Sequence, residues 1–475
     1  MSELPLLTFG LAFFIPIGYA LVAASGLPAD RSRQAAVSVL AALGLSVLGY
    51  VITGFALQFG GIGLIHQQPG FDGLIWEWSA LGVTWGPGWG MAGLAGWGLA
   101  GGAATAEART VALANLPWLL TATLIPVSAL RGRIPAWGTA LLGLLTGALI
   151  YPLAGNWIWG GGWLANLGAN LGLAHGFVDV AGAGLVHLLG AAVTLAGIVA
   201  FLPRPPRPPA DGRPVPLPEA RLPLLSLLGV GLLFAGLAAW LTANPLLPEG
   251  VELPRFLLGS LICAAGAALL ALGYTWLVAG RADPLMAARG AAAGLTAGLA
   301  AAAFIPVWAC LVLGALVGLL TPLAIYFFDR IVRWHDPTAA LVVHGMGGLF
   351  GLLAVGLLAD GTAGAGWNGI GAGGYAGVAG QGVTGLLAAA GMRSDFPLQL
   401  QAQLFGSGAL VVLGFFAAWL FLAPLATAVF LLRPRQVAAP VAQEQTLREE
   451  PAMAEALAAA DEAVLPLEQE AALPG

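Results

Sequence analysis

Long apolar stretches run through the whole chain and alternate with short segments rich in arginine, proline and glycine. An α-helix needs about 20 apolar residues to cross the hydrocarbon core of a bilayer, and each stretch is close to that length. The pattern predicts an all-α, polytopic membrane protein with eleven transmembrane helices. They are expected at about residues 5–27, 35–59, 111–130, 136–154, 179–202, 222–242, 256–280, 286–304, 307–328, 338–358 and 403–432.

The segments between these stretches predict how the chain is organised. Residues 1–202 are expected to form a first membrane repeat of five helices, and residues 222–358 a second. Between them lies a linker, 203–221, which is rich in proline and arginine and whose prolines are incompatible with a helix. The remaining segments are expected to be an external glycine-rich loop at 359–402, the eleventh helix at 403–435 and an acidic cytoplasmic tail at 436–475.

The positions of the charges predict the orientation of the helices. The chain is 59% hydrophobic and 9% charged, with a mean hydropathy of +0.88, and all 18 of its basic residues are arginine. With the N-terminus outside, only Arg109, Arg255 and Arg393 lie on the outer face. The positive-inside rule therefore favours an external N-terminus and, with eleven spans, a cytoplasmic C-terminus and linker.

The remaining composition excludes several functions. The net charge of -5 gives no indication of nucleic-acid binding. Cys263 and Cys310 lie in apolar stretches, where packed thiols are typical, and the sequence shows no metal or cofactor motif. A long segment at 60–110 carries five tryptophans, for which we expect an interfacial belt or a packed lid over a vestibule.

Two acid-to-histidine spacings stand out within the apolar stretches. Asp179 precedes His187 by eight residues in DVAGAGLVHLLG, and Asp336 precedes His344 by eight residues in HDPTAALVVHGMGG. An ionisable group at membrane depth costs several kcal/mol unless it faces a cavity or a partner. With the predicted topology the two histidine helices run in opposite directions, five spans apart. This arrangement predicts an inverted repeat, helices one to five against six to ten, with both imidazoles near the midplane.

These residues also have structural interpretations. Asp179 at a helix start is a favourable cap for orphan backbone N–H groups. A histidine in an apolar helix is commonly a packed core residue, and similar spacings arise by chance in a chain rich in glycine, alanine and leucine. The functional alternative is a pair of neutral rings in which one donates to the other and leaves an acceptor free, a chemistry that relays a proton.

Several motifs, in order along the chain, resemble the ammonium transporter, methylammonium permease and Rhesus protein family. They are GYALVAASGLPADRSR, VITGFALQFG, SALRGRIPAW, WIWGGGWL, DVAGAGLVH and HDPTAALVVHGMGGLFG. The last two are the most specific. The resemblance to this family, as a divergent member of bacterial type, implies a homotrimer with one pore in each subunit, in the inner (plasma) membrane.

The resemblance implies roles for particular residues at the pore. His187 and His344 would be the twin histidines that line the pore. Asp179 would be the buried acid beneath an external ammonium recruitment site, and Trp159 the tryptophan on which the cation rests.

Other positions differ from the family pattern. Trp118 and Trp240 would replace two gate phenylalanines, with Trp118 also facing the recruitment site, and Asn244 would replace a recruitment-site serine. Ala339 and Leu341 stand where the family usually has an acid and an aromatic residue. These departures bear on rate and ion selectivity rather than on fold.

The predicted function is ammonium transport without catalysis. An external aromatic and acidic site would bind ammonium and take its proton, and neutral ammonia would pass the histidine pair with or without a proton. One alternative is a sensor or scaffold that binds ammonium without transport. Another is a Rhesus-type channel for neutral ammonia or carbon dioxide. A regulatory protein of the PII type is a possible partner at the cytoplasmic face, although the family's tail motif is not recognisable after Arg435.

Overall fold

The computed structural model describes residues 3–25, 32–85, 88–202, 223–248 and 250–432. Its α-helices are α1 Glu3–Ala12, α2 Phe14–Ala24, α3 Ser32–Gly49, α4 Phe55–Phe59, α5 Ala106–Ala129, α6 Ala136–Leu145, α7 Tyr151–Ile158, α8 Leu167–Leu171, α9 Leu189–Ala200, α10 Pro223–Ala243, α11 Leu253–Ala279, α12 Pro284–Ala301, α13 Val307–Tyr326, α14 Gly347–Leu358 and α15 Leu398–Leu432. The chain separates into two units, Met1–Ala426 and Thr427–Gly475. The first unit holds all of these helices except the last turns of α15.

Short helical segments of other types complete the helices. The π-helical turns are η2 Tyr50–Gly54, η7 Thr146–Ile150, η8 Ala183–Leu188, η9 Phe327–Val332 and η10 Leu341–Met346. The 3-10 turns are η3 Ile62–Leu64, η4 Val83–Trp85, η5 Trp97–Leu99, η6 Gly101–Ala103 and η11 Trp367–Gly369. The π turns continue α-helices without a break, so that η8 leads directly into α9 and η10 into α14. Such turns are frequent at functional sites.

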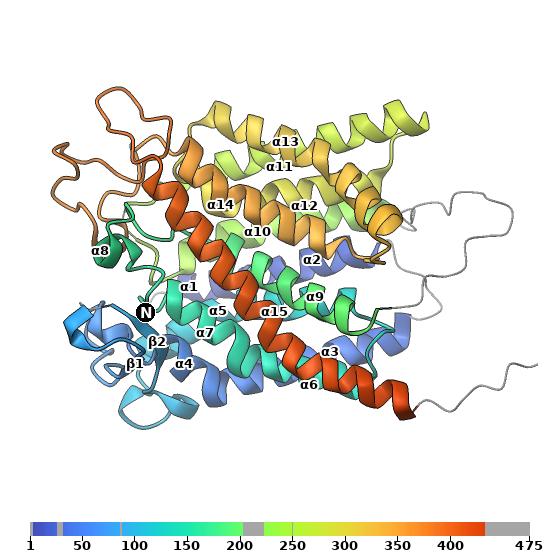
Figure 1. Ribbon diagram of the computed structural model, residues 1–475, viewed down its shortest axis with the longest axis horizontal. Coiled ribbons are helices and arrows are strands. Elements are labelled where there is room, and N and C mark those ends of the chain that lie inside the picture. Colours follow the sequence, from blue (N-terminus) through green and yellow to red (C-terminus); the bar gives the residue numbers. More distant parts are fainter. Residues whose placement is uncertain (1–2, 26–31, 86–87, 203–222, 249, 433–475) are drawn as a thin grey trace, which may run out of the picture. The chain divides into compact units, whose positions relative to one another are not determined.

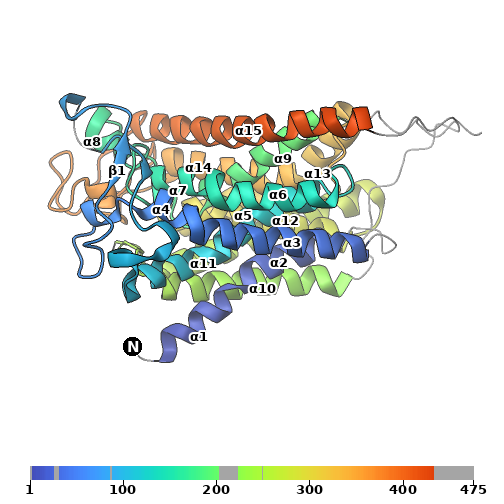
Figure 2. The same ribbon diagram turned by 90° about the horizontal axis from the view of Figure 1, so that it is seen from below.

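The long helices lie side by side within the first unit (Figures 1 and 2). Ten stretches in the described residues are long and apolar enough to cross a membrane. The expectation of an all-α membrane protein is therefore confirmed. The expected span at 286–304 is a helix, α12, but is not among the ten, because Arg289 and its many small residues lower its hydropathy. The count of eleven spans and their orientation stay predictions.

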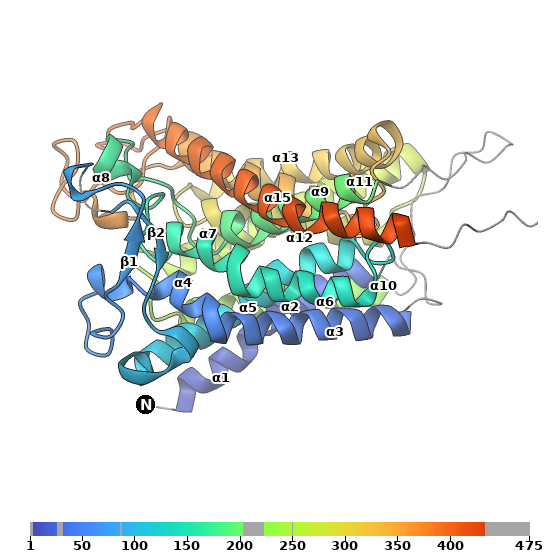
Figure 3. The same ribbon diagram turned by 60° about the horizontal axis from the view of Figure 1, so that its bottom comes forward.

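Glycine lets several of these helices approach at backbone distance. A Cβ at Gly143 of α6 would lie 2.2 Å from a carbonyl oxygen of α3, and one at Gly147 of η7 would lie 2.1 Å from another. A Cβ at Gly314 or Gly318 of α13 would lie 2.4 or 2.3 Å from a carbonyl oxygen of α11. Small residues spaced four apart are the usual device for close helix packing in a membrane, where hydrophobic burial between helices offers little. α15 crosses the bundle over α9 (Figure 3), with Gly414 close to Leu189.

One end of the bundle carries the longer connections. A two-stranded antiparallel sheet, β1 Glu77–Ser79 and β2 Gly90–Gly93, lies there together with α8 (Figure 1). The tryptophans of the 60–110 segment are largely exposed, with Trp76 70% and Trp85 67% accessible. Exposure of this kind fits an interfacial belt better than a packed lid. The predicted linker at 203–221 and the acidic tail at 436–475 lie outside the described residues.

Candidate functional site

A polar cavity of about 440 Å³ opens at the end of the bundle that carries β1 and β2. Four of the predicted recruitment and gate residues contribute to its wall: Trp159, Asp179, Trp240 and Asn244. We call this cavity the vestibule. Its wall also contains amide and imidazole side chains that were not predicted, namely His66, Gln68, Asn115, Asn166 and Asn368. The wall therefore combines aromatic faces, neutral hydrogen-bond acceptors and one carboxylate, which are groups that attract a cation.

Five rings follow one another from the vestibule into the bundle. Trp159 stacks on Trp240, with ring centroids 5.9 Å apart and planes at 29°. Trp240 meets Trp118 edge to face at 5.3 Å, and Trp118 meets His187 in the same way at 6.1 Å. His187 then stacks on His344 at 5.0 Å and 15°. These five residues, which we call the ring file, place the two histidines below the predicted gates.

The two histidines are in direct contact, as the twin-histidine prediction expects. Their Nδ1 atoms lie 2.7 Å apart, a distance at which one ring donates its proton to the other. His187 is 0% and His344 7% exposed, and the Nε2 of His187 has no hydrogen-bond partner among the described residues. In a neutral pair one proton therefore lies between the two Nδ1 atoms, and each Nε2 stays outside this contact.

Asp179 and Asp336 have the same structural role in the two halves of the chain, because each accepts one or more hydrogen bonds from backbone N–H groups at the start of a helix. The Asp179 carboxylate accepts backbone N–H groups of Gly182, Gly184 and Leu185 at 2.8–3.0 Å. Asp336 accepts the N–H of Leu341 at 2.8 Å. Each acid thus satisfies the orphan donors at the start of the helix that carries its histidine, as the capping interpretation expects.

The remaining predicted residues lie at different depths. Trp118 does not line the vestibule; it is 1% exposed and lies between Trp240 and His187. Its indole N–H has no acceptor among the described residues, whereas Trp240 donates to the carbonyl oxygen of Ala114 at 2.8 Å. Asn244 reaches the vestibule, with its Oδ1 accepting the N–H of Leu246.

The two departures downstream of Asp336 lie away from the vestibule. Ala339 is buried with a positive φ of 56°, in the turn that precedes η10. Leu341 lines a second cavity, which is described below.

One residue at the histidines was missed. The ring of Tyr19, in α2, lies 4.9 Å from both histidine rings, and its hydroxyl is 2.9 Å from the Thr296 hydroxyl of α12. Tyr19 belongs to the motif GYALVAASG, which was singled out for its resemblance but not for a side chain. A lone tyrosine in a spanning helix gives no periodic signal, so only the packing of α2 against α12 reveals its position.

A buried polar network was also missed. Gln58 accepts the Tyr50 hydroxyl at 2.9 Å and donates to Asn115 at 3.2 Å, and the Tyr151 hydroxyl reaches the same Asn115 oxygen at 3.3 Å. Asn115 lines the vestibule, so the network fixes one polar group of its wall. In the described part of the chain no group of histidine, cysteine and acidic residues is arranged to hold a metal ion.

The fold and the site together define a multi-pass membrane transport protein. The chain belongs to the ammonium transporter family, whose family model matches residues 4–437. Ammonium transporter Amt2 of Archaeoglobus fulgidus is 28% identical over 359 residues, which cover 74% of this chain and 70% of that protein. The ammonium transporter of Bacillus subtilis is 30% identical over 244 residues, or 51% of this chain and 55% of that protein.

Solved structures resemble the fold over nearly its whole length. A protein described as a sensor Amt protein has a TM-score of 0.68 at 20% identity and covers 89% of this chain and 92% of its own. Mep2 of Saccharomyces cerevisiae has a TM-score of 0.67 at 17% identity, covering 92% and 91%. The Rh50 protein of Nitrosomonas europaea has a TM-score of 0.60 at 16% identity, covering 97% and 100%. At these identities the likeness concerns the fold alone.

Proposed function

We propose that the protein transports ammonium across the cell's inner membrane, as a homotrimer with one pore in each chain. The observation that carries the proposal is the ring file, with a carboxylate near its outer end and a hydrogen-bonded histidine pair at its inner end. Trp159 and Asp179 bind the cation in the vestibule. Ammonium passes its proton to water in the vestibule, and neutral ammonia moves past Trp240 and Trp118 toward the histidines. The proton crosses separately and is relayed by the histidine pair.

Selectivity in this proposal comes from the loss of the proton. A potassium ion has nearly the size of ammonium but has no proton to give up, so it cannot shed its charge. An apolar passage closed by rings therefore excludes potassium, because a bare charge at that depth costs several kcal/mol. His187 and His344 offer neutral ring nitrogens along the passage, where they accept a hydrogen bond from ammonia or relay the proton.

The equivalent surroundings of the two histidines support an inverted repeat of residues 1–202 and 222–358. Each histidine lies in a π turn that opens its helix, and each helix is capped by an acid eight residues earlier. Substrate paths in inverted repeats run between the halves near the midplane.

Flux and current in proteoliposomes test the proposal. Full-length protein should take up ammonium and carry a current, while the double variant His187→Ala with His344→Ala should lose proton-coupled passage. Uptake of ammonium or ammonia without current would replace the proposal by the Rhesus-type neutral channel. Specific ammonium binding without flux would replace it by the sensor. Full flux by the double variant, with potassium still excluded, would contradict the role of the histidines.

A further inference from the structure

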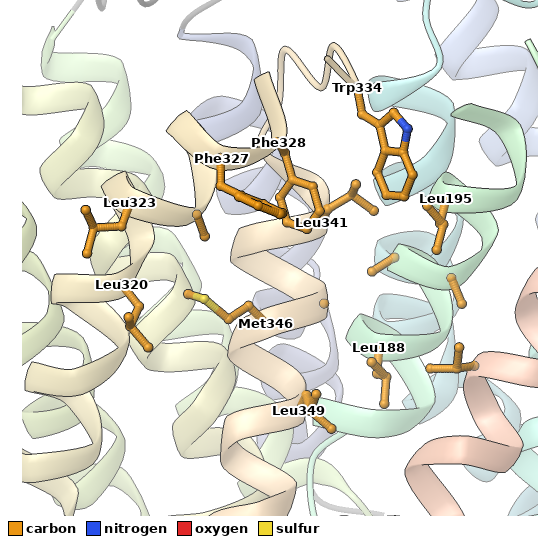
Figure 4. Close-up of a pocket in the computed structure, with 15 residues that line it drawn as sticks. Leu188, Leu195, Leu320, Leu323, Phe327, Phe328, Trp334, Leu341, Met346 and Leu349 are labelled. Atoms are coloured by element: carbon orange, nitrogen blue, oxygen red, sulfur yellow. The ribbon is translucent and has the colours of Figure 1, made fainter. Parts of the chain in front are cut away.

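An apolar cavity of about 570 Å³ lies outside the passage, against the helices that carry the histidines. Its walls come from η8 and α9, from α13 and η9, from η10 and α14, and from α15 (Figure 4). We call it the side cavity. Four of the ten stretches that can cross a membrane contribute to it, so it lies between helices that are expected to be embedded in hydrocarbon. Its volume is within the range of about 300–1,000 Å³ that is usual for small-molecule sites.

The lining determines what kind of molecule the side cavity accepts. Its fifteen lining residues are aliphatic, aromatic, glycine or methionine, and the one N–H group among their side chains belongs to Trp334. Phe327, Phe328 and Trp334 lie at one end, and Leu188 and Leu349 lie toward the other (Figure 4). A polar or charged occupant would lose its hydration without gaining a partner. An occupant must therefore be apolar along most of its length.

The size and opening of the side cavity distinguish between two kinds of occupant, a single hydrocarbon chain and a helix of another protein. A helix with side chains is about 10 Å across, so a volume of 570 Å³ would be filled by little more than one of its turns. The side cavity opens sideways, because Leu323 and Phe327 at its edge are 40% and 45% exposed. A flexible hydrocarbon chain from the surrounding bilayer can enter through that edge, whereas a rigid helix cannot.

Charge at the mouth indicates the headgroup. The segment that joins Phe328 to Trp334 carries Arg330 and Arg333, and neither guanidinium has a hydrogen bond or ion pair with any part of the chain that the structure describes. The acid of this segment, Asp329, instead accepts the backbone N–H of Asp336 at 3.3 Å. Trp334, stacked on Phe328 at 5.8 Å, is of the type enriched at membrane interfaces. The mouth therefore presents positive charge at headgroup depth.

We propose that the side cavity binds one acyl chain of an anionic membrane phospholipid, whose headgroup contacts Arg330 and Arg333. The site is separate from the ammonium path and does not depend on it. The side cavity nevertheless adjoins the ammonium path, since Leu188 and Gly345 line the cavity and directly follow His187 and His344. A bound chain completes the packing behind the two π turns.

Native mass spectrometry of delipidated full-length protein tests the proposal with dioleoyl phosphatidylglycerol and dioleoyl phosphatidylcholine. The dissociation constant of the first lipid bound per chain should be about tenfold lower for the anionic lipid. Ala324→Phe, which fills the side cavity, should raise the dissociation constant of the anionic lipid at least tenfold. Val312→Phe adds the same ring to an exposed site of α13 outside the side cavity and should change nothing.

The headgroup contact is tested by the double variant Arg330→Gln with Arg333→Gln. It should bind both lipids equally, whereas Arg109→Gln, beside the vestibule end of α5, should keep the preference. Unchanged binding by Ala324→Phe, or a preference that survives the double variant, would overturn the proposal.

A fluorescence measurement keeps the proposal testable if Ala324→Phe does not fold. Phosphatidylglycerol with brominated acyl chains should quench the wild type more than Trp334→Phe, because bromine in the side cavity lies against that indole. Equal quenching of the two proteins under saturating lipid would place the acyl chain elsewhere and overturn the site.

Discussion

At the scale of single residues, the two gate tryptophans differ in what their indoles bind. Trp240 donates to Ala114, whereas the N–H of Trp118 is buried and has no acceptor among the described residues. A buried donor without a partner costs about 1–3 kcal/mol, so the unpaired N–H of Trp118 beside His187 destabilises the folded protein. The two positions should therefore respond differently to the same substitution.

We expect Trp118→Phe to raise ammonium flux with little loss of stability. A phenyl ring removes the unpaired donor and opens space above His187, and a barrier lower by about 1 kcal/mol gives roughly fivefold faster passage. Trp240→Phe also widens the passage, but it removes the hydrogen bond from the indole to the Ala114 carbonyl and should lower the melting temperature. Uptake rates and melting curves of both variants check this. An unchanged or slower rate for Trp118→Phe would mean that Trp118 is not a gate.

A second residue-scale feature lies outside the spanning segments, where His175 and Asp395 face each other. The Nδ1 of His175 is 3.8 Å from the Oδ2 of Asp395, and the ring of Tyr375 is 4.8 Å from that of His175. Burial lowers the pKa of His175 to about 4. Burial raises the pKa of Asp395 to about 6, against the opposing effect of its hydrogen bond with Tyr375.

The two shifts should oppose each other in the pH dependence of stability. Between pH 6.5 and 4 the unfolded chain protonates His175 more readily than the folded one, so this residue destabilises the fold as pH falls. Between pH 6 and 3.8 the folded chain protonates Asp395 more readily, so this residue stabilises the fold as pH falls. The wild type should therefore change little across this range.

Replacing either residue should reveal the pH dependence of stability that the other contributes. Asp395→Asn should become less stable, by on the order of 1–2 kcal/mol, when the pH falls from 7 to 5, and His175→Gln should become more stable. Melting temperatures in detergent at the two pH values check the signs. The same slope in both variants would contradict the assignment.

At the scale of helices, close packing depends on glycine at particular crossings. A Cβ at Gly318 would lie 2.3 Å from the carbonyl oxygen of Ala267 and 2.4 Å from its Cα, both backbone atoms of α11 that cannot give way cheaply. Gly231 of α10 has no neighbour within 4 Å of such a Cβ. Gly231 therefore serves as the control for a substitution at Gly318.

Gly318→Ala should destabilise the protein by about 1–3 kcal/mol or more, because α11 and α13 must separate. Gly231→Ala should be neutral or stabilising by up to about 1 kcal/mol, because alanine favours a helix. Melting temperatures of the purified variants measure both effects. A Gly318→Ala protein as stable as Gly231→Ala would show that the crossing is not tightly packed.

The helices themselves were largely predictable from the sequence, because hydropathy reports burial in lipid over whole spans. The stretch expected at 222–242 is α10 Pro223–Ala243. The stretch expected at 111–130 ends one residue after α5, which begins five residues earlier, at Ala106. The π turns at His187 and His344 were not predictable, because they depend on tertiary packing rather than on composition. The contact between the two histidines was expected from their spacing and topology, whereas Tyr19 and the side cavity follow only from how helices distant in sequence meet.

At the scale of the whole molecule, the membrane domain and the C-terminal segment separate. The family model ends at residue 437, and the unit Met1–Ala426 contains the vestibule, the ring file and the side cavity. A chain that ends after Arg435 should therefore fold and transport ammonium at the rate of the full chain. Uptake by both forms in proteoliposomes checks this, with and without a PII-type protein. Loss of transport on truncation would assign the tail a part in the pore.

The ring file also has a consequence for the energetics of the membrane. Because the rings touch from the vestibule to the histidines, each passage requires several close-packed rings to turn together, which packed interiors resist. If ammonia takes this path, we expect the protein to be an electrical insulator between such events and to leave the stored proton gradient intact. Turning the rings costs activation enthalpy, so we expect ammonium transport by the proposed path to slow much more steeply in the cold than diffusion in water does.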